Sequence, residues 1–282
     1  MDAPERPEST RGNRPAEWED ARPAVSPVHH HLVLGAVLLL CACTTHSGSR
    51  RSVYRGVTVL PSTGIQSIVV RNGAGSVRVV AAHDDAITLD VDVLLDEARP
   101  QLDAQKNVLD HVLVHSTDSR VEFVDAHASK GDANDWELRI TLHVPAGRSL
   151  EIDQGMGEVT VVLPDTRDLR VANASGSIHA QVAVVDGALD LRVQQGEVEA
   201  EVRDRIAGEA NVETVTGQAS LALPAAVEGS FELSCATGEL QVAGRYGLPV
   251  ERLGQGARAH GRVGERASTH RLRVSQGSAV LR

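Results

Sequence analysis

The most constraining feature of this chain is a glycine that recurs at a nearly constant interval. Five of these glycines, separated by 19, 20, 21 and 21 residues, are Gly157, Gly176, Gly196, Gly217 and Gly238. Gly277 follows after 39 residues, close to two intervals, and Gly75 opens the series ahead of a long insertion. A regular period of about 20 residues indicates one small structural unit that is repeated and stacked.

Apolar residues flank each repeated glycine at fixed distances. They lie seven and five residues before it and two and four residues after it, as in Leu189, Leu191, Val198 and Ala200 around Gly196. A spacing of two places side chains on one face of a β-strand. Each unit is therefore predicted to be a strand, a tight turn and a second strand, because glycine supplies the positive φ of a compact corner.

The polar positions between these apolar residues are expected to face solvent. Six residues before the glycines the side chains alternate in charge, in the order Glu151, Arg170, Asp190, Asn211, Glu232 and Arg271. Units stacked at the strand spacing of about 4.8 Å would bring unlike charges side by side. Such exposed pairs stabilise by only about a few tenths of a kcal/mol each, so we expect their main effect on the register.

These patterns predict an all-β fold, and repetition in phase favours a parallel β-solenoid with about 20 residues per repeat. An antiparallel meander of hairpins is compatible with the same alternation and stays open as the alternative. The six aromatic residues of the chain are too few to build its core, which must therefore consist of Val, Leu, Ile and Ala.

Two segments interrupt the repeat. A short helical and strand insertion is predicted near residues 96–135, with a helix over 96–110, a strand over 111–124 and a polar loop over 125–135. A further strand is predicted over 136–144. Residues 244–269 contain six glycines and are predicted to form a loop or a degenerate unit.

The N-terminal part has the pattern of a lipoprotein leader. Residues 32–42 (LVLGAVLLLCA) are apolar and uncharged, about half the length that spans a bilayer but typical of a signal peptide. Leu40-Cys41-Ala42-Cys43 resembles a bacterial lipobox, in which the cysteine is acylated on sulfur and the leader is cut before it. We therefore expect lipid attachment at Cys43, and Thr44 in place of an aspartate favours the outer membrane if the organism has one.

This pattern divides the chain into an N-terminal extension and signal peptide (1–42), a linker (43–56) and the repeat domain (57–282). Residues 1–28 are rich in Pro, Glu and Arg, and only three histidines flank the apolar stretch, so the true start could be Val25 or Val28. The alternative interpretation of residues 32–42 is a buried strand of a cytosolic protein.

Charge argues against nucleic acid as a partner. The formal net charge is −10, and no stretch is rich in Lys or Arg, whereas phosphate neutralisation needs clustered cations. Cys235 stands alone and is expected to be a small buried hydrophobic residue. Gly-x-Gly at 73–75 and 155–157 is not followed by a predicted helix, so dinucleotide binding is not supported.

Acidic residues are numerous, so a polysaccharide-active enzyme has to be weighed. Glu158, Glu197 and Glu239 share one position of the repeat but occur only in every second unit. Glycoside cleavage needs two carboxylates that face one bond at about 5–9.5 Å. We interpret these glutamates as part of a solvated face.

Metal binding has equally weak support. Two oxygen-rich clusters, Asp84/Asp85 and Asp132/Asn134/Asp135, lack the spaced ligands of a Ca²⁺ loop. His111 and His115 have a spacing that pairs ligands on a helix but fall in a predicted strand, and His179 is expected at the surface. The sequence therefore predicts no catalytic, cofactor-binding or metal-binding residue.

Three stretches resemble a bacterial family of β-strand-repeat domains of unknown function, known as "putative adhesin" domains. They are residues 68–93, residues 136–164 with the motif Leu-His-Val-Pro-Ala-Gly, and the Gly-x-apolar-x-apolar units up to residue 242. The resemblance covers residues 57–282. It implies a right-handed β-solenoid at the cell envelope, with no catalytic residues and no ligand set.

The function expected from these observations is that of a non-enzymatic envelope lipoprotein that binds an unknown protein or polysaccharide along its external rows of polar side chains. One alternative is a sensory or regulatory module of the envelope. A polysaccharide-active β-helix enzyme is the other alternative.

Overall fold

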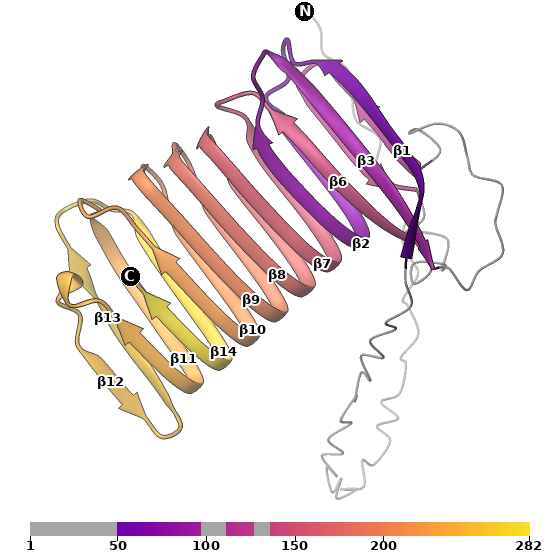
Figure 1. Cartoon of the computed structure of the whole chain (residues 1–282). Coiled ribbons are helices and arrows are strands. Elements are labelled where there is room, and N and C mark those ends of the chain that lie inside the picture. Colours follow the sequence, from indigo (N-terminus) through magenta and orange to yellow (C-terminus); the bar gives the residue numbers. More distant parts are fainter. Residues whose placement is uncertain (1–49, 97–110, 127–135) are drawn as a thin grey trace, which may run out of the picture. The chain divides into compact units, whose positions relative to one another are not determined.

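The computed structural model describes residues 50–96, 111–126 and 136–282, all of which belong to one compact unit, Ser47–Arg282. Fourteen strands form a single mixed sheet (Figure 1). A 3₁₀ helix, η1, covers Gly244–Tyr246. Among the described residues, no helix is both long and apolar enough to cross a lipid bilayer. The predicted all-β class is confirmed.

Seven long strands form the middle of the sheet, and each contains one of the repeated glycines. They pair in parallel with their glycines in register. Parallel pairing excludes the antiparallel meander for this part of the chain. The seven strands are β2 (Ser67–Ala81), β7 (Ser149–Thr166), β8 (Leu169–Val185), β9 (Leu189–Ile206), β10 (Ala210–Ala222), β11 (Gly229–Val242) and β14 (Thr269–Leu281).

Each repeated glycine has a positive φ within its strand, and we call this position the bend. The ribbons of the long strands curve at one end (Figure 1). Gly196 has a φ of 137°, a conformation that residues with a Cβ atom rarely adopt. A Cβ atom at Gly196 would also lie 1.7 Å from the carbonyl oxygen of Gly176 in the neighbouring strand. Glycine is therefore required both by the backbone conformation and by the close approach of the next strand.

The apolar residues on both sides of the bend point into one core. In β9, Leu189 and Leu191 before the bend and Val198 and Ala200 after it are all buried. Glu197, which is adjacent to Val198, is exposed. The predicted inward and outward positions are therefore confirmed.

The order of the strands in space differs from their order in the chain at two places. The last strand, β14, lies between β10 and β11, so that Gly277 stacks between Gly217 and Gly238. In the same way β2 lies between β7 and β6 (Trp136–Val144), which follows it in the chain. The repeat units from Gly75 to Gly217 therefore stack in chain order, and the order changes at β14.

Antiparallel strands border the parallel strands at both ends, so the predicted parallel arrangement does not extend to the whole sheet. At one end, β3 (Ala86–Asp96) pairs with β6 and with β1 (Arg50–Pro61). At the other end, β13 (Gly256–Val263) pairs with β11 and with β12 (Val250–Leu253). Residues 244–269 thus form strands where a loop or degenerate unit was expected. Their hairpin covers the hydrogen-bonding edge that β11 would otherwise expose.

The insertion supplies two strands that stack beside β2. β5 (Arg120–Asp125) runs parallel to the first half of β2, while β6 runs parallel to its second half. β4 (Val112–Ser116) pairs with β5 in an antiparallel ladder. The predicted strand over 136–144 is confirmed, whereas residues 111–124 form two antiparallel strands, β4 and β5, in place of the one strand predicted. The predicted helix falls mostly on residues outside the described ranges.

Candidate functional site

A trough of about 810 Å³ crosses the sheet beside the glycine bends. It runs over β5, β2, β7, β8, β9 and β10, so that strands far apart in the sequence contribute to it. Its lining residues, which we call the trough, are Arg71, Asn72, Gly73, Val124, Asp153, Gln154, Gly155, Ala172, Asn173, Ala174, Arg192, Val193, Gln194, Glu213 and Val215.

Small side chains at outward positions account for the trough. Gly73, Gly155 and Ala174 lie two residues before the repeated glycines of three neighbouring strands, and Ala172 lies next to them on β8. Ala172 and Ala174 are exposed. Because these positions lack bulky side chains, the surface is hollow here and its lining is largely apolar.

Two rows of residues run along the trough, one position from each of six strands. The near row lies four residues before the repeated glycines and is Arg71, Asp153, Ala172, Arg192 and Glu213, with Val124 of β5 in register beside Arg71. The far row lies six residues before them, just outside the lining residues, and is Val69, Glu151, Arg170, Asp190 and Asn211, with Glu122 of β5 in register beside Val69.

Arg71 is the centre of an ionic cluster at one end of the trough. Its guanidinium lies 2.6 Å from a carboxylate oxygen of Glu122, 2.6 Å from one of Asp153 and 3.8 Å from one of Glu151. The hydrogen bond from Arg71 lowers the pKa of Glu122 below its usual range. The same hydrogen bond raises the pKa of Arg71. One cation here faces three carboxylates.

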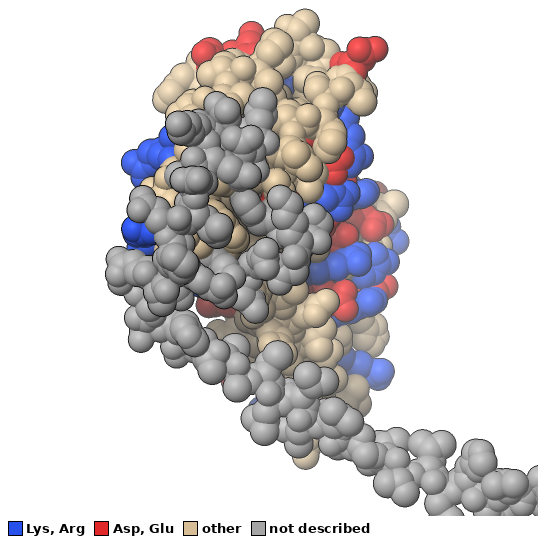
Figure 2. All heavy atoms as spheres, turned by 90° about the vertical axis from the view of Figure 1, so that its right-hand side faces the viewer, with Lys and Arg blue, Asp and Glu red and all other residues tan. Residues whose placement is uncertain are grey.

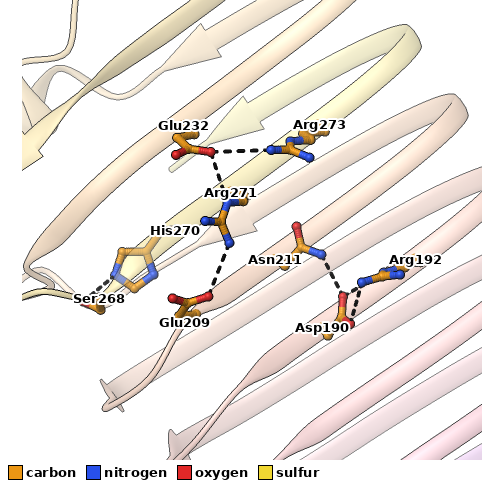
Figure 3. Close-up of polar contacts among 9 residues, drawn as sticks. All are labelled: Asp190, Arg192, Glu209, Asn211, Glu232, Ser268, His270, Arg271 and Arg273. Carbon is orange, nitrogen blue, oxygen red and sulfur yellow. Dashed lines mark hydrogen bonds and ion pairs between the residues drawn. The ribbon is translucent and has the colours of Figure 1, made fainter.

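The other end of the trough has a different arrangement. Arg192 pairs with Asp190 of its own strand at 2.9 Å, and Asn211 donates a hydrogen bond to the same carboxylate at 2.8 Å (Figure 3). Glu213 and Arg170 make no ion pair with any residue in the described part of the chain. Glu213 lines the trough and lies in register between Arg192 of β9 and Arg273 of β14.

Buried side-chain amides among the lining residues of the trough hold the bends in place. Asn72 donates a hydrogen bond to Gln154 Oε1 at 3.0 Å, and Gln154 donates to the carbonyl oxygen of Gly75 at 3.3 Å. Asn173 donates to the carbonyl oxygen of Gly157 at 2.8 Å. These amides satisfy carbonyl groups at the bends, where the strand is too sharply curved for a regular ladder.

The far row continues beyond the trough onto the strands of the C-terminal end. Arg271 reaches Glu209 at 3.3 Å and Glu232 at 3.1 Å, and Arg273 lies 3.5 Å from Glu232 (Figure 3). Arg271 bridges these acids because β14 lies between β10 and β11. The predicted alternation of charge is therefore present, but with Arg271 between Asn211 and Glu232.

Lys or Arg and Asp or Glu side chains alternate along the right-hand side of the view in Figure 2. The picture shows no large region covered by Lys and Arg alone, in keeping with the net charge of −10. Clustered cations that could neutralise a phosphate backbone are therefore not seen on this face.

The predicted glutamate row lies on the other side of the bends. Glu158, Glu197 and Glu239 are exposed and in one register, but Ser278 of β14 intervenes before Glu239. The sequence predicted a glutamate in every second strand, but the strand order in space breaks this regularity before Glu239. None of the three glutamates lines the trough.

The other candidates from the sequence do not assemble into a site. Asp84 accepts a hydrogen bond from the backbone of Ala86 at 3.2 Å. His179 lies 3.6 Å from Glu199 at the surface, as expected. His111 is buried, whereas His115 is exposed. Among the described residues, no three His, Cys, Asp or Glu side chains are grouped to hold a metal ion.

The structure tests the prediction for Cys235 but not the prediction for Cys43. Cys235 is buried, as predicted, and contacts the carbonyl oxygen of Gly277 at 3.4 Å. Burial raises the pKa of its thiol. Cys43, and with it the predicted lipid attachment, lies outside the described residues, as do Asp132, Asn134 and Asp135.

Sequence reasoning missed the trough, although a signal was present. A glycine or alanine precedes the repeated glycine by two residues in three strands that stack together, at Gly73, Gly155 and Ala174. At 73–75 and 155–157 this appeared only as a Gly-x-Gly turn. These small residues form a hollow in the surface only because their strands are neighbours in the sheet.

Comparisons with known proteins give no family for this chain: no family model matches it, and no curated protein matches it. Several solved structures are similar in fold. A "putative cell adhesion protein" from Clostridium sporogenes is 12% identical, with a TM-score of 0.46, and the match covers 81% of this chain and 98% of that one.

Two further solved structures are more distant. A "putative adhesin" from Bacteroides fragilis is 11% identical, with a TM-score of 0.31 and coverage of 82% and 97%. A "putative lipid binding protein" from Parabacteroides distasonis is 9% identical, with a TM-score of 0.22 and coverage of 81% and 96%. At these values the likenesses carry no conclusion about function.

Proposed function

We propose that this protein is a non-enzymatic, lipid-anchored protein of the bacterial envelope that binds a protein or polysaccharide partner through the trough and its two rows. The trough carries this proposal, because it is a continuous hollow built from six strands rather than a pocket around one reactive group. Extended surfaces of stacked repeats suit long or repetitive partners.

We further propose that the repeat is a right-handed parallel β-solenoid of the "putative adhesin" kind. The in-register parallel pairing of seven strands supports a coil of about 20 residues, and so does burial on both sides of every bend. The antiparallel strands at the two ends act as caps of this coil. Terminal caps are a general feature of stacked repeats.

The polar groups around the trough favour binding over catalysis. Glu122, Glu151 and Asp153 all face Arg71, and the hydrogen bond from Arg71 lowers the pKa of Glu122. A glycosidase acid needs the opposite environment, one that raises the pKa of a carboxyl group. The cluster is suited to hold charge at a fixed place on the surface.

The anchor is tested by expressing the full chain with its leader in a bacterial host. We expect the protein to partition into detergent, and Cys43→Ala should move it to the aqueous phase or leave it unprocessed. Cys41→Ala is the matched control and should have no effect. Mass spectrometry that finds residue 43 intact and unacylated in the native host would contradict the anchor and the envelope localisation.

Binding is tested with the full chain purified in detergent and incubated with cell-wall and acidic polysaccharides, with and without Ca²⁺. We expect association without product release, and gradual weakening on single substitution of Asp153, Arg192 or Glu213, which line the trough. Release of a product that disappears on replacing one Asp or Glu would overturn the non-enzymatic assignment.

A further inference from the structure

The sheet ends in two edge strands of very different kinds. Among the described strands, β12 pairs only with β13 at one end, and β1 pairs only with β3 at the other (Figure 1). β12 has four residues, of which Glu251 and Arg252 are charged. Proteins commonly prevent pairing between sheet edges by making the edge strand short and charged. β12 is therefore a protected edge.

β1 has such protection only in its first half. The register with β3 shifts just after Ser52, and the charged side chains of β1 are Arg50, Arg51 and Arg55. The second half, residues 56–60 (GVTVL), contains no charged residue and no proline. An uncharged, regular edge of this kind is a template on which a further strand can pair.

Two valines are exposed on the outer face of this second half. Val57 is 60% exposed and Val59 is 61% exposed, the highest values among the large hydrophobic residues that the structure describes. Between and after them, Thr58 and Leu60 are half-buried, and Leu60 packs against the core. A strand added to this edge would therefore bury apolar surface that the single chain leaves in water.

We infer that β1 pairs in antiparallel fashion with β1 of a second copy of this chain, across a twofold axis at Thr58. In this register Val57 of each copy lies opposite Val59 of the other, so that four valines meet on the outer face. The inference goes beyond the proposed function, because β1 contributes no residue to the trough.

The sequence of β1 is complementary to itself in this orientation. Antiparallel pairing places Arg50 and Arg51 of each copy beyond the paired residues, and Arg55 lies opposite the uncharged Pro61 of the second copy. Parallel pairing would place each arginine beside its own equivalent, and like charges that lie opposite one another destabilise a sheet. A twofold interface of this kind is closed after two copies, so it leaves no further β1 edge open.

The size of the contact predicts a weak dimer. Residues 55–61 extend over about 24 Å, and one strand pair of this length buries less surface than the roughly 1,200–2,000 Å² of a stable complex. We therefore expect a dissociation constant on the order of 10 µM. Attachment of both copies to one membrane would favour the dimer further, because it raises their effective concentration.

The strength of the dimer is tested by sedimentation velocity of the full chain in detergent, over a range of concentrations. We expect a monomer–dimer equilibrium, and Val57→Lys should raise the dissociation constant at least about tenfold, since lysine on an edge strand opposes pairing. Val162→Lys is the matched control, because Val162 is also exposed but belongs to β7, which is paired on both sides. It should leave the dissociation constant unchanged. Thermal melts establish that both variants are folded.

The register is tested by cysteine cross-linking of the full chain. Thr58 would lie opposite Thr58 of the second copy, at a Cα separation of about 4.5–5.5 Å that a disulfide can bridge. Thr58→Cys should therefore form a disulfide-linked dimer under mild oxidation. Ser52→Cys, exposed on the same strand, should not, because antiparallel pairing keeps it about 40 Å from its equivalent. The wild type measures the background from the native cysteines.

Four results would overturn the inference. They are a wild type that stays monomeric at about 200 µM, equal dissociation constants for the wild type and Val57→Lys, cross-linking of Ser52→Cys as efficient as that of Thr58→Cys, or a cross-link from Thr58→Cys to a different protein in the native host. Detergent partitioning through Cys43 and polymer binding at the trough do not depend on β1. Failure of the dimer is therefore distinguishable from failure of the proposed function.

Discussion

The carbonyl oxygen of Gly217 lies 1.7 Å from the point that a Cβ atom would occupy at Gly277, although the two glycines are far apart in the chain. They are in register because β14 returns from the C-terminal hairpin and pairs with β10. The bend of the last strand is thus in direct contact with the bend of a strand from the middle of the repeat.

This contact makes Gly277 a sensitive position. Gly277→Ala would place a methyl group on the carbonyl of Gly217 and would strain a φ of 138°. We expect the free energy of unfolding to fall by at least about 2 kcal/mol, measured by urea denaturation. Gly244→Ala is the control, since nothing lies within 4 Å of its added Cβ atom and a small effect is expected. Equal losses in the two variants would contradict the stacked bends.

The repeat, and which of its side chains point into the core, could be predicted from sequence because both follow local rules. The alternation around Gly196 decides which side chains of β9 are buried, whatever strand lies beside it. The position of β14 could not be predicted in this way. Its apolar pattern, Leu272, Val274, Ala279 and Leu281, is that of every other unit, so it fits between any two of them.

The trough was missed for the same reason. Ala174 and Gly155 are small residues in separate units, and they form a hollow only because their strands are neighbours. Arg71 and Glu122 likewise meet across an insertion whose pairing with β2 no local pattern specifies. Long-range pairing decides where surface side chains gather, whereas local patterning decides which of them are at the surface.

The register of β9 predicts that substitutions at two adjacent residues differ strongly in their effect on stability. Val198 is completely buried, so Val198→Asp would bury an unpaired charge and should lower the free energy of unfolding by about 3 kcal/mol or more. Glu197→Ala should change it by less than about 0.5 kcal/mol, since this side chain is exposed. Comparable thermal melts for the two variants would show that the register is wrong.

The ion pairs of Arg271 allow the position of β14 to be tested with surface substitutions. A double-mutant cycle with Arg271→Ala and Glu232→Ala should give a coupling energy of about 0.2–1 kcal/mol, because both side chains are partly exposed. The coupling should decrease in high salt. Arg192→Ala combined with Glu232→Ala serves as the uncoupled control. Zero coupling between Arg271 and Glu232 at low salt would count against the pairing of β14 with β11.

His270 predicts how stability depends on pH. It is buried at an inward position of β14 against Phe231, at a ring-centroid distance of 5.1 Å. Burial lowers the pKa of this histidine, while the backbone carbonyl of Glu228 and the charge of Glu209 oppose the shift. The folded protein therefore binds its proton less readily than the unfolded chain does.

The sign of the effect follows from this difference. Above the ordinary histidine pKa of about 6.5, both states are neutral at this position and stability is unaffected. As the pH falls below that value, the unfolded chain takes up a proton that the folded protein does not, so stability decreases until the lowered pKa is reached. For one group the slope is at most about 1.4 kcal/mol per pH unit.

The measurement compares urea denaturation of the wild type and of His270→Leu between pH 7.5 and about 5. Leucine suits this position because Leu189 is buried at the equivalent place in β9. We expect the wild type to lose more stability than His270→Leu as the pH falls, since the variant lacks the buried imidazole. His179→Gln, at the surface beside Glu199, should retain the wild-type loss. Parallel pH profiles for the wild type and His270→Leu would mean that the imidazole is not buried as the structure places it.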